Sequence, residues 1–190
     1  VAVDESVRAR FTADLADLQN WGTKHKHLHL NAICQDYAKA TPSGMTCTLP
    51  GPTGERNLYS VLPRELVLCC AESEQDLATQ LAATIAVDSN AVVPRRFQSM
   101  VDSLPVNLRE RISTFEEWRG FHFDAVIYHG QRAQAEELAQ QVIKCRDEII
   151  SVIYLPSGST DVPLERLVIE RSISINTTAA GGNASLMTID

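Results

Sequence analysis

Two adjacent cysteines, Cys69 and Cys70, are candidates for a catalytic nucleophile. A catalytic cysteine reacts as its thiolate and needs surroundings that lower its pKa. Both residues lie in the apolar run LVLCCA, residues 66–71, where burial would raise the pKa of a thiol and where no basic residue adjoins them. We therefore interpret them as small core residues. The three other cysteines, which stand in no catalytic context either, are Cys34, Cys47 and Cys145.

Histidines at four positions are the next candidates. His129 ends the strong apolar run 124–128 and could act as a general acid or base. No partner carboxylate is identifiable in the sequence, so we expect a hydrogen-bonding histidine instead. His25, His27 and His29 alternate in KHKHLHL and would share one face of a strand, where they could bind a metal. Because no cysteine or carboxylate at ligand spacing accompanies them, we favour a solvated start of a helix.

Phosphate-binding signals are weak. GPTGER, residues 51–56, lacks the Gly-Lys-Ser/Thr ending of a phosphate-binding loop. The stretch 42–56 is rich in Pro, Gly, Ser and Thr, which predicts a structural loop at a domain boundary. After the run at 66–71, the turn CCAESEQD contains Glu72, Glu74 and Asp76 and no glycine, so a pyrophosphate would meet carboxylates instead of bare N–H groups. This argues against dinucleotide binding.

Strands and helices alternate between residues 66 and 155. This order predicts an α/β domain, with a Rossmann-like and mainly parallel sheet flanked by helices. Ser73 is positioned to cap the helix that follows the first strand. The expected strands are 66–71, 91–93, 111–114, 124–128 and 149–155, and the expected helices are 73–86, 97–104 and 131–145.

Two features leave the order of the strands open. The gap from Thr114 to Asp124 is short for a helical crossover. The segment Asn90 to Val93 begins with a polar residue, which suggests a peripheral strand. In such a sheet, ligands bind at the carboxyl ends of the strands. There we expect Ala71, Glu72, His129, Gly130 and residues 156–159.

The two ends of the chain carry different patterns. Apolar residues recur every three or four positions in 5–21 and 30–41, which predicts two amphipathic helices in an N-terminal helical connector, residues 1–48. Residues 166–176 alternate with period 2, which predicts a long C-terminal β-strand and flap extension. A long terminal strand is an aggregation hazard unless it pairs with something. We expect it to dock onto another sheet or domain, and an ordinary edge strand with a frayed tail is the alternative.

Eight residues of this terminal segment are the candidate docking residues. The charged ones would fix the register of an interface, and the small or polar ones would make close backbone contacts. They are Arg166, Glu170, Arg171, Asn176, Thr177, Gly181, Gly182 and Asn183.

Composition limits the classes of partner and compartment. The net charge of −7 argues against nucleic acid as the main partner of this chain, and no apolar run reaches the length of a membrane helix. The five cysteines form no disulfide framework and suit a reducing compartment, so we expect a cytoplasmic protein. The first residue is Val1, and no signal peptide follows it, which we interpret as an internal boundary of a longer protein.

Three stretches together resemble the long proline utilization A family: the terminal segment 164–190, the block 49–71 and the run FDAVIYHG, residues 123–130. The resemblance covers nearly the whole chain in the same order, and it implies the C-terminal, aldehyde-dehydrogenase-like domain of such a protein. It implies three parts: the connector 1–48, a Rossmann-like domain 49–163 and a docking segment 164–190. No catalytic residue, cofactor or metal is expected within this chain.

The parent enzyme implied by this resemblance oxidises proline with FAD and then oxidises pyrroline carboxylate, or glutamate semialdehyde, with NAD. The chain would support the dehydrogenase domain and help close the channelling tunnel. Its partners would be the catalytic domains of its own or a sister chain. The resemblance leaves open an N-terminal DNA-binding domain, which some members of the family carry, and peripheral attachment of the parent to a membrane. Two rival functions stay open, a working dinucleotide-binding module and an oligomerisation module whose terminal strand pairs between chains.

Overall fold

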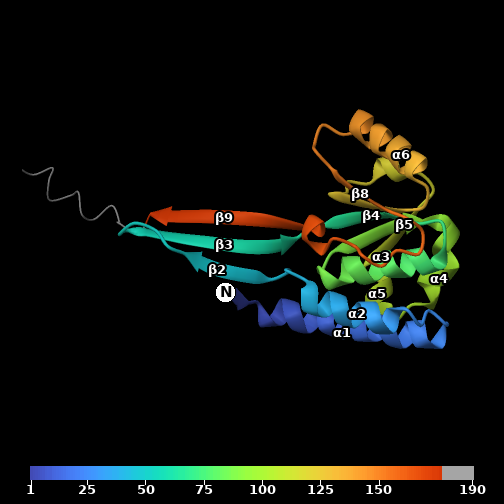
Figure 1. Ribbon diagram of the computed structural model, residues 1–190, viewed down its shortest axis with the longest axis horizontal. Coiled ribbons are helices and arrows are strands. Elements are labelled where there is room, and N and C mark those ends of the chain that lie inside the picture. Colours follow the sequence, from blue (N-terminus) through green and yellow to red (C-terminus); the bar gives the residue numbers. More distant parts are fainter. Residues whose placement is uncertain (177–190) are drawn as a thin grey trace, which may run out of the picture.

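The computed structural model describes residues 1–176, which form an α/β body and an arm of antiparallel strands that projects from it (Figure 1). The sheet of the body is parallel throughout, with the strand order β6-β5-β4-β7-β8. Its strands are β4 (Leu66–Cys70), β5 (Asn90–Pro94), β6 (Ile112–Phe115), β7 (Ala125–His129) and β8 (Ser151–Leu155). The Rossmann-like architecture predicted from the alternating pattern is confirmed.

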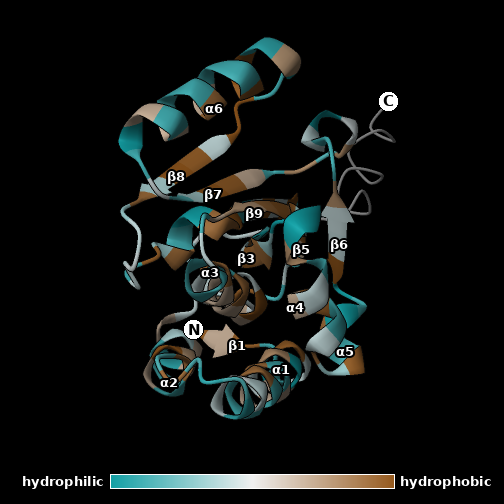
Figure 2. Ribbon diagram, turned by 90° about the vertical axis from the view of Figure 1, so that its right-hand side faces the viewer, coloured by the Kyte–Doolittle hydropathy of each residue, from teal (hydrophilic) through white to brown (hydrophobic). Residues whose placement is uncertain are grey.

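Helices cover both faces of this sheet (Figure 2). Helix α3 (Glu74–Ala86) is capped by Ser73, whose hydroxyl accepts a hydrogen bond from the Asp76 amide at 3.1 Å. The predicted cap is therefore confirmed. Nearly every residue of α3 is buried, because the sheet lies on one side of the helix and α1 and α2 on the other. The short helices α4 (Gln98–Ser103) and α5 (Val106–Arg109) follow β5 in the chain and precede β6. Helix α6 (Arg132–Cys145) covers the face of the sheet opposite to α3.

The connection from β6 to β7, residues 116–124, contains only the 3₁₀ turn Trp118–Gly120. It leads from one edge of the sheet to β7, on the far side of β5 and β4. Trp118 and Phe123 pack edge to face, with ring centres 5.8 Å apart, against Leu68 and Val126 on the α6 side. Aromatic side chains thus cover the part of this face where a crossover helix would otherwise lie.

The peripheral position expected for the segment from Asn90 to Val93 is wrong. Strand β5 lies between β6 and β4, and Val92 and Val93 are fully buried. The polar Asn90 stands only at the entrance of the strand, where its amide bonds to the carbonyl of Glu65. One polar residue at a strand end therefore says little about where the rest of the strand lies.

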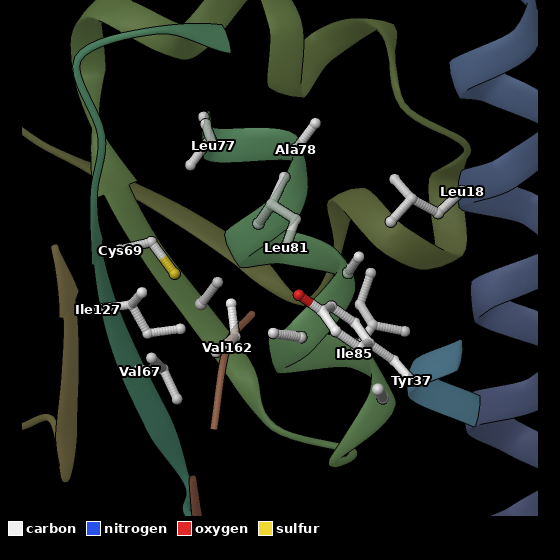
Figure 3. Packing of buried hydrophobic residues seen from close by; sticks show 14 of the residues in the cluster. Leu18, Tyr37, Val67, Cys69, Leu77, Ala78, Leu81, Ile85, Ile127 and Val162 are labelled. Atoms are coloured by element: carbon white, nitrogen blue, oxygen red, sulfur yellow. The ribbon is translucent and has the colours of Figure 1, made fainter. Parts of the chain in front are cut away.

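The N-terminal helices α1 (Glu5–Lys24) and α2 (Leu30–Ala40) form an outer layer against α3, in agreement with their predicted amphipathic pattern. Leu18 of α1 and Tyr37 of α2 join one continuous core with Leu81 and Ile85 of α3 (Figure 3). Polar contacts reinforce this layer, because Arg111 reaches Asp14 of α1 at 2.5 Å and Asp88 at 3.1 Å.

The arm is a second sheet with the order β1-β2-β3-β9, and all its pairings are antiparallel. It consists of β1 (Ala2–Val3), β2 (Met45–Leu49), β3 (Glu55–Pro63) and β9 (Val168–Asn176). The loop predicted over 42–56 is wrong for β2 and for the start of β3, whereas residues 42–44 and the hairpin connection 50–54 are turns or irregular structure. Since β2 contains both Thr48 and Leu49, one strand crosses the expected boundary between connector and Rossmann-like domain.

The predicted C-terminal strand is present, but it begins two residues later than expected. Arg166 and Leu167 belong to a 3₁₀ turn, Leu164–Leu167, and β9 then pairs with β3 from Val168↔Pro63 to Asn176↔Glu55. The physical reason is that Leu164 and Leu167 are buried in the body, so the chain must turn before it can enter the arm.

Candidate functional site: a filled switch point and an exposed arm

The point at which ligands bind in sheets of this kind lies between β4 and β7, where the strand order reverses. On the α3 side, this position is filled by the chain itself. The Gln80 amide donates to the carbonyls of Cys70 at 2.8 Å and Ile127 at 3.3 Å, and therefore bridges the two strands. His129 lies beside it, fully buried, with Nδ1 2.9 Å from the same amide nitrogen and Nε2 2.9 Å from the Ser159 carbonyl.

These contacts define the state of His129. An amide N–H donor at Nδ1 and a carbonyl acceptor at Nε2 require a neutral ring with its proton on Nε2. Burial lowers the pKa of His129, and this effect outweighs the opposing influence of the Ser159 carbonyl and of the Asp76 charge. The predicted hydrogen-bonding histidine at the strand end is confirmed.

Asp76 occupies the helix start at which a pyrophosphate would bind. Its carboxylate accepts hydrogen bonds from the Ser73 hydroxyl at 2.8 Å, the Ser157 hydroxyl at 2.6 Å and the Gly158 amide at 2.7 Å. Gly158 has φ +81°, a conformation that favours glycine and lets the segment after β8 turn over the start of α3. Burial would raise the pKa of Asp76, but these hydrogen bonds outweigh it and hold the pKa below its usual value.

The consequence for phosphate binding is direct. An ionised carboxylate and the segment 157–159 occupy the N-terminus of α3, so its positive dipole end is already neutralised from within the chain. The carboxylates of this turn are evident in the sequence, but the segment that closes over them is not. The bond partners are about 80 residues apart, and no local pattern links them.

The cysteines at the end of β4 behave as predicted. Burial raises the pKa of Cys69 to about 12, although Thr84 opposes the shift. It also raises the pKa of Cys70 to about 12, although the charge of Arg96 opposes the shift. At neutral pH both are therefore thiols and poor nucleophiles.

The three N-terminal histidines lie around Trp21 and not on one strand face. His25 and His27 stack on its indole ring, with centres 4.9 Å and 5.1 Å away, and His29 meets His27 edge-on. Burial lowers the pKa of His27 and His29. Among residues 1–176, no group of three or more His, Cys, Asp and Glu side chains is arranged to hold a metal ion.

Arg166 lies at the body and not on the arm. Its guanidinium donates to the Ser151 hydroxyl at 2.9 Å and to the Val152 carbonyl at 3.3 Å. Because β8 is an edge strand, Arg166 occupies a backbone acceptor that would otherwise be open to another strand. This contact is within residues 1–176, whereas the sequence suggested a contact across an interface with another sheet or domain.

The other predicted docking residues of β9 lie on two faces of the arm. Arg171 stands opposite Ser60 and Glu170 opposite Val61, and both charged side chains are exposed. Asn176 pairs with Glu55 at the far end of the arm (Figure 1). The four remaining candidates lie outside the described residues: Thr177, Gly181, Gly182 and Asn183.

One face of the arm is open and largely apolar, and it also carries the exposed side chains of Arg171 and Arg56. The register places Ile169 opposite Leu62 and Ile173 opposite Leu58, with Ile175 next along the same face. Ile169, Ile175 and Leu62 are 43%, 42% and 38% exposed. The opposite face packs on the body near its base, where Val61 and Val168 are buried. The strand β9 is also an edge of its sheet, so its outer backbone groups have no neighbouring strand within residues 1–176.

A parallel sheet with the switch point between β4 and β7, together with an antiparallel arm, matches known structures. A betaine aldehyde dehydrogenase from Staphylococcus aureus in complex with NAD⁺ aligns with a TM-score of 0.60 at 10% identity, over 80% of this chain and 38% of the other. A Bradyrhizobium japonicum Proline Utilization A (PutA) mutant aligns with a TM-score of 0.59 at 18% identity, over 80% of this chain and 20% of the other. The chain thus has the aldehyde dehydrogenase fold.

Sequence similarity identifies the family. The chain is 44% identical over 191 residues to the bifunctional protein PutA of Escherichia coli, and 40% identical over 191 residues to that of Salmonella typhimurium. Each alignment covers 98% of this chain and 14% of the relative, so the chain spans about a seventh of the length of these relatives. No protein-family model matches the sequence. The chain belongs to the PutA family, as a domain with the aldehyde dehydrogenase fold.

Membrane insertion through a helix has no support in residues 1–176. None of their helices combines the length and the hydropathy that a transmembrane span requires.

Proposed function

We propose that this chain is a non-catalytic domain, at the C-terminal end of a bifunctional proline-catabolic enzyme, that docks on the dehydrogenase domain through its arm. There it would support the dehydrogenase and close the tunnel through which pyrroline carboxylate passes between two active sites. FAD and NAD would belong to the catalytic domains of the parent chain, and the compartment would be the cytoplasm.

The observation that carries this proposal is the apolar face of the arm. Leu62, Ile169 and Ile175 remain about two-fifths exposed on a projecting sheet whose edge strand, β9, has no neighbouring strand on its outer side within residues 1–176. Exposed apolar faces and open strand edges are the features of surfaces that bind another protein part.

The filled switch point supports the non-catalytic part of the proposal. Gln80, His129 and Asp76 use their hydrogen bonds within the chain, and Cys69 and Cys70 are kept as thiols by burial. A dinucleotide would have to displace the segment 157–159 before it reached the N-terminus of α3. The rival function as an NAD-binding module is therefore disfavoured, and titration of NAD into the chain tests it directly.

The main test uses the parent enzyme with Ile169→Lys and Ile175→Lys together. The matched control is Ser172→Lys with Ser174→Lys, which adds the same charge to the opposite face of the same strand. NADH formation would be followed from proline and, separately, from added pyrroline carboxylate. We expect a lag from proline, with the second activity intact, in the first variant and not in the control.

Other outcomes would correct the proposal. Loss of both NADH-forming activities would mean that the arm supports the dehydrogenase fold and does not seal a channel. No change in either activity would refute the docking role. Sedimentation of the chain with and without residues 164–190 tests the oligomerisation rival, which requires that the truncation change the assembly state.

A further inference from the structure

The α6 side of the sheet is open at the same switch point. A cavity of about 550 Å³ lies over the carboxyl ends of β4, β5, β6 and β7, beside the first half of α6. Cys70 and Tyr128, which are paired across β4 and β7, form its floor. This α6-side cavity is separated by the sheet from the position that Gln80 and His129 fill. It lies where the topology of an open α/β sheet places ligands.

Two arginines line the α6-side cavity. Arg96 is held in place by a hydrogen bond to the Ala71 carbonyl and by the Phe97 ring, whose centre is 5.0 Å from its guanidinium carbon. Its remaining N–H groups have no hydrogen-bond partner among residues 1–176. Arg95 is 65% exposed and lies 3.5 Å from the carboxylate of Glu116, itself 78% exposed, a pair that contributes little to stability. Both guanidinium groups are therefore available to a ligand.

The carboxylates limit the charge that the α6-side cavity can accept. Glu72 and Glu116 also line it, so its four charged side chains sum to zero. Glu72 lies close to Gly130, where an added Cβ would be 2.7 Å from its Oε1, so this exposed carboxylate stands at the rim of the site. A diphosphate would meet these two negative charges, whereas a single carboxylate bound by the arginines would not be strongly opposed.

Much of the rest of the lining is apolar. It includes Pro94, Phe115, Trp118 and Leu138, and the Tyr128 hydroxyl, which also lines the cavity, donates to Gln134 at 2.7 Å. These apolar side chains suit a flat aromatic or an aliphatic group of a ligand, while two guanidinium groups suit the planar geometry of a carboxylate. We propose that the α6-side cavity binds a small organic monocarboxylate, with its carboxylate at Arg95 and Arg96 and its apolar body against Phe115 and Trp118. This proposal is independent of the docking role of the arm.

Benzoate is a suitable probe, because the chain has only two tryptophans and only Trp118 lines the α6-side cavity. In ¹⁵N-edited NMR spectra of the 190-residue chain, benzoate should shift the Trp118 indole N–H saturably and leave that of Trp21 in place. Arg96→Gln should weaken binding at least tenfold, and Arg95→Gln, at an exposed position, should weaken it without disturbing the fold. The control Arg132→Gln removes the same charge outside the cavity and should leave the affinity unchanged.

Three results would overturn the proposal. These are no saturable shift of the Trp118 signal, equal shifts of both tryptophans, or an affinity that neither Arg95→Gln nor Arg96→Gln lowers. A parallel titration with AMP separates carboxylate from phosphate ligands. Tighter binding of AMP than of benzoate, with the same dependence on the arginines, would reassign the cavity to phosphate esters.

Discussion

Asp76 and Gly158 are joined by a 2.7 Å hydrogen bond from the backbone amide to the carboxylate, although 82 residues separate them in the sequence. Together with the Ser157 hydroxyl, this bond fixes the segment after β8 over the start of α3. The closure of the switch point therefore depends on one buried carboxylate. Removal of this carboxylate should change the stability of the isolated chain measurably.

Asp76→Ala should lower the free energy of unfolding by about 2–3 kcal/mol, because it leaves the Gly158 amide and two hydroxyls without their charged acceptor. Hydrogen exchange at residues 157–159 should accelerate as well. The matched control is Glu74→Ala, at an exposed position in the same first turn of α3, which should cost no more than about 0.5 kcal/mol. Equal losses in the two variants, measured by urea denaturation, would contradict this account.

Arg111→Met should lower the free energy of unfolding by about 3 kcal/mol, since it leaves the nearly buried Asp14 without its cation and leaves Asp88 with Arg10 alone. The side chains of Asp14 and Asp88 are 11% and 6% exposed, and Arg111 contacts both. The control is Arg132→Met, which breaks the exposed pair with Glu136 and should cost about 0.5 kcal/mol or less. A small effect of Arg111→Met would mean that this ion pair adds little to the apolar packing and the other polar contacts of α1.

The stability of the chain should fall as the pH drops below about 6.5. Burial lowers the pKa of His129 from 6.5, so the folded state keeps the ring neutral while the unfolded chain takes up a proton. His27 and His29 add to the fall for the same reason. The pKa of Asp76 is lowered from 3.8. The stability that its ionised carboxylate contributes is therefore present above pH 3.8 and is lost only as the pH falls further.

His129→Gln should therefore flatten the dependence of unfolding free energy on pH between about 5 and 6.5, whatever its effect on stability at neutral pH. Urea denaturation at a series of pH values measures the slope. An unchanged slope in the variant would show that His129 does not take up its proton on unfolding in this range.

Alkylation should distinguish the cysteines by burial. Cys145 is exposed and should react with iodoacetamide at pH 8 in the folded chain, whereas Cys69 is fully buried with a pKa of about 12. Cys34, with its pKa also raised to about 12 by burial, should be protected in the same way. Mass spectrometry of peptides before and after unfolding provides the measurement. Rapid modification of Cys69 in the folded chain would contradict the core assignment.

The arm face should matter for docking and little for the isolated chain. Ile169→Lys with Ile175→Lys should change the free energy of unfolding of the 190-residue chain by less than about 1 kcal/mol, because both side chains are about two-fifths exposed. Thermal denaturation of this variant beside Ser172→Lys with Ser174→Lys supplies the measurement. A much larger loss in the isoleucine variant would mean that this face packs within the chain.

The body could be predicted from the sequence because its elements carry local signals. The run at 66–71 and the cap at Ser73 indicated β4 and α3 directly. The arm could be predicted only in part. Strand β3 alternates weakly, and its partner β9 lies more than 100 residues away, so nothing near residue 55 indicates the pairing. A bond such as that between Gln80 and the Ile127 carbonyl likewise depends on tertiary structure and has no local signature.

The register of the arm has a consequence for the order of folding. Pro63↔Val168 lies at the base and Glu55↔Asn176 at the tip, so the part of the body from β4 to β8, with α3 to α6, is a closed loop between the two strands. Its termini at residues 63 and 168 are brought together when the body folds, and the entropy of closing that loop is then already lost. We expect β3 and β9 to pair last and to zip outward from the base. Amide protection should therefore decline toward the tip, and unfolding should begin there.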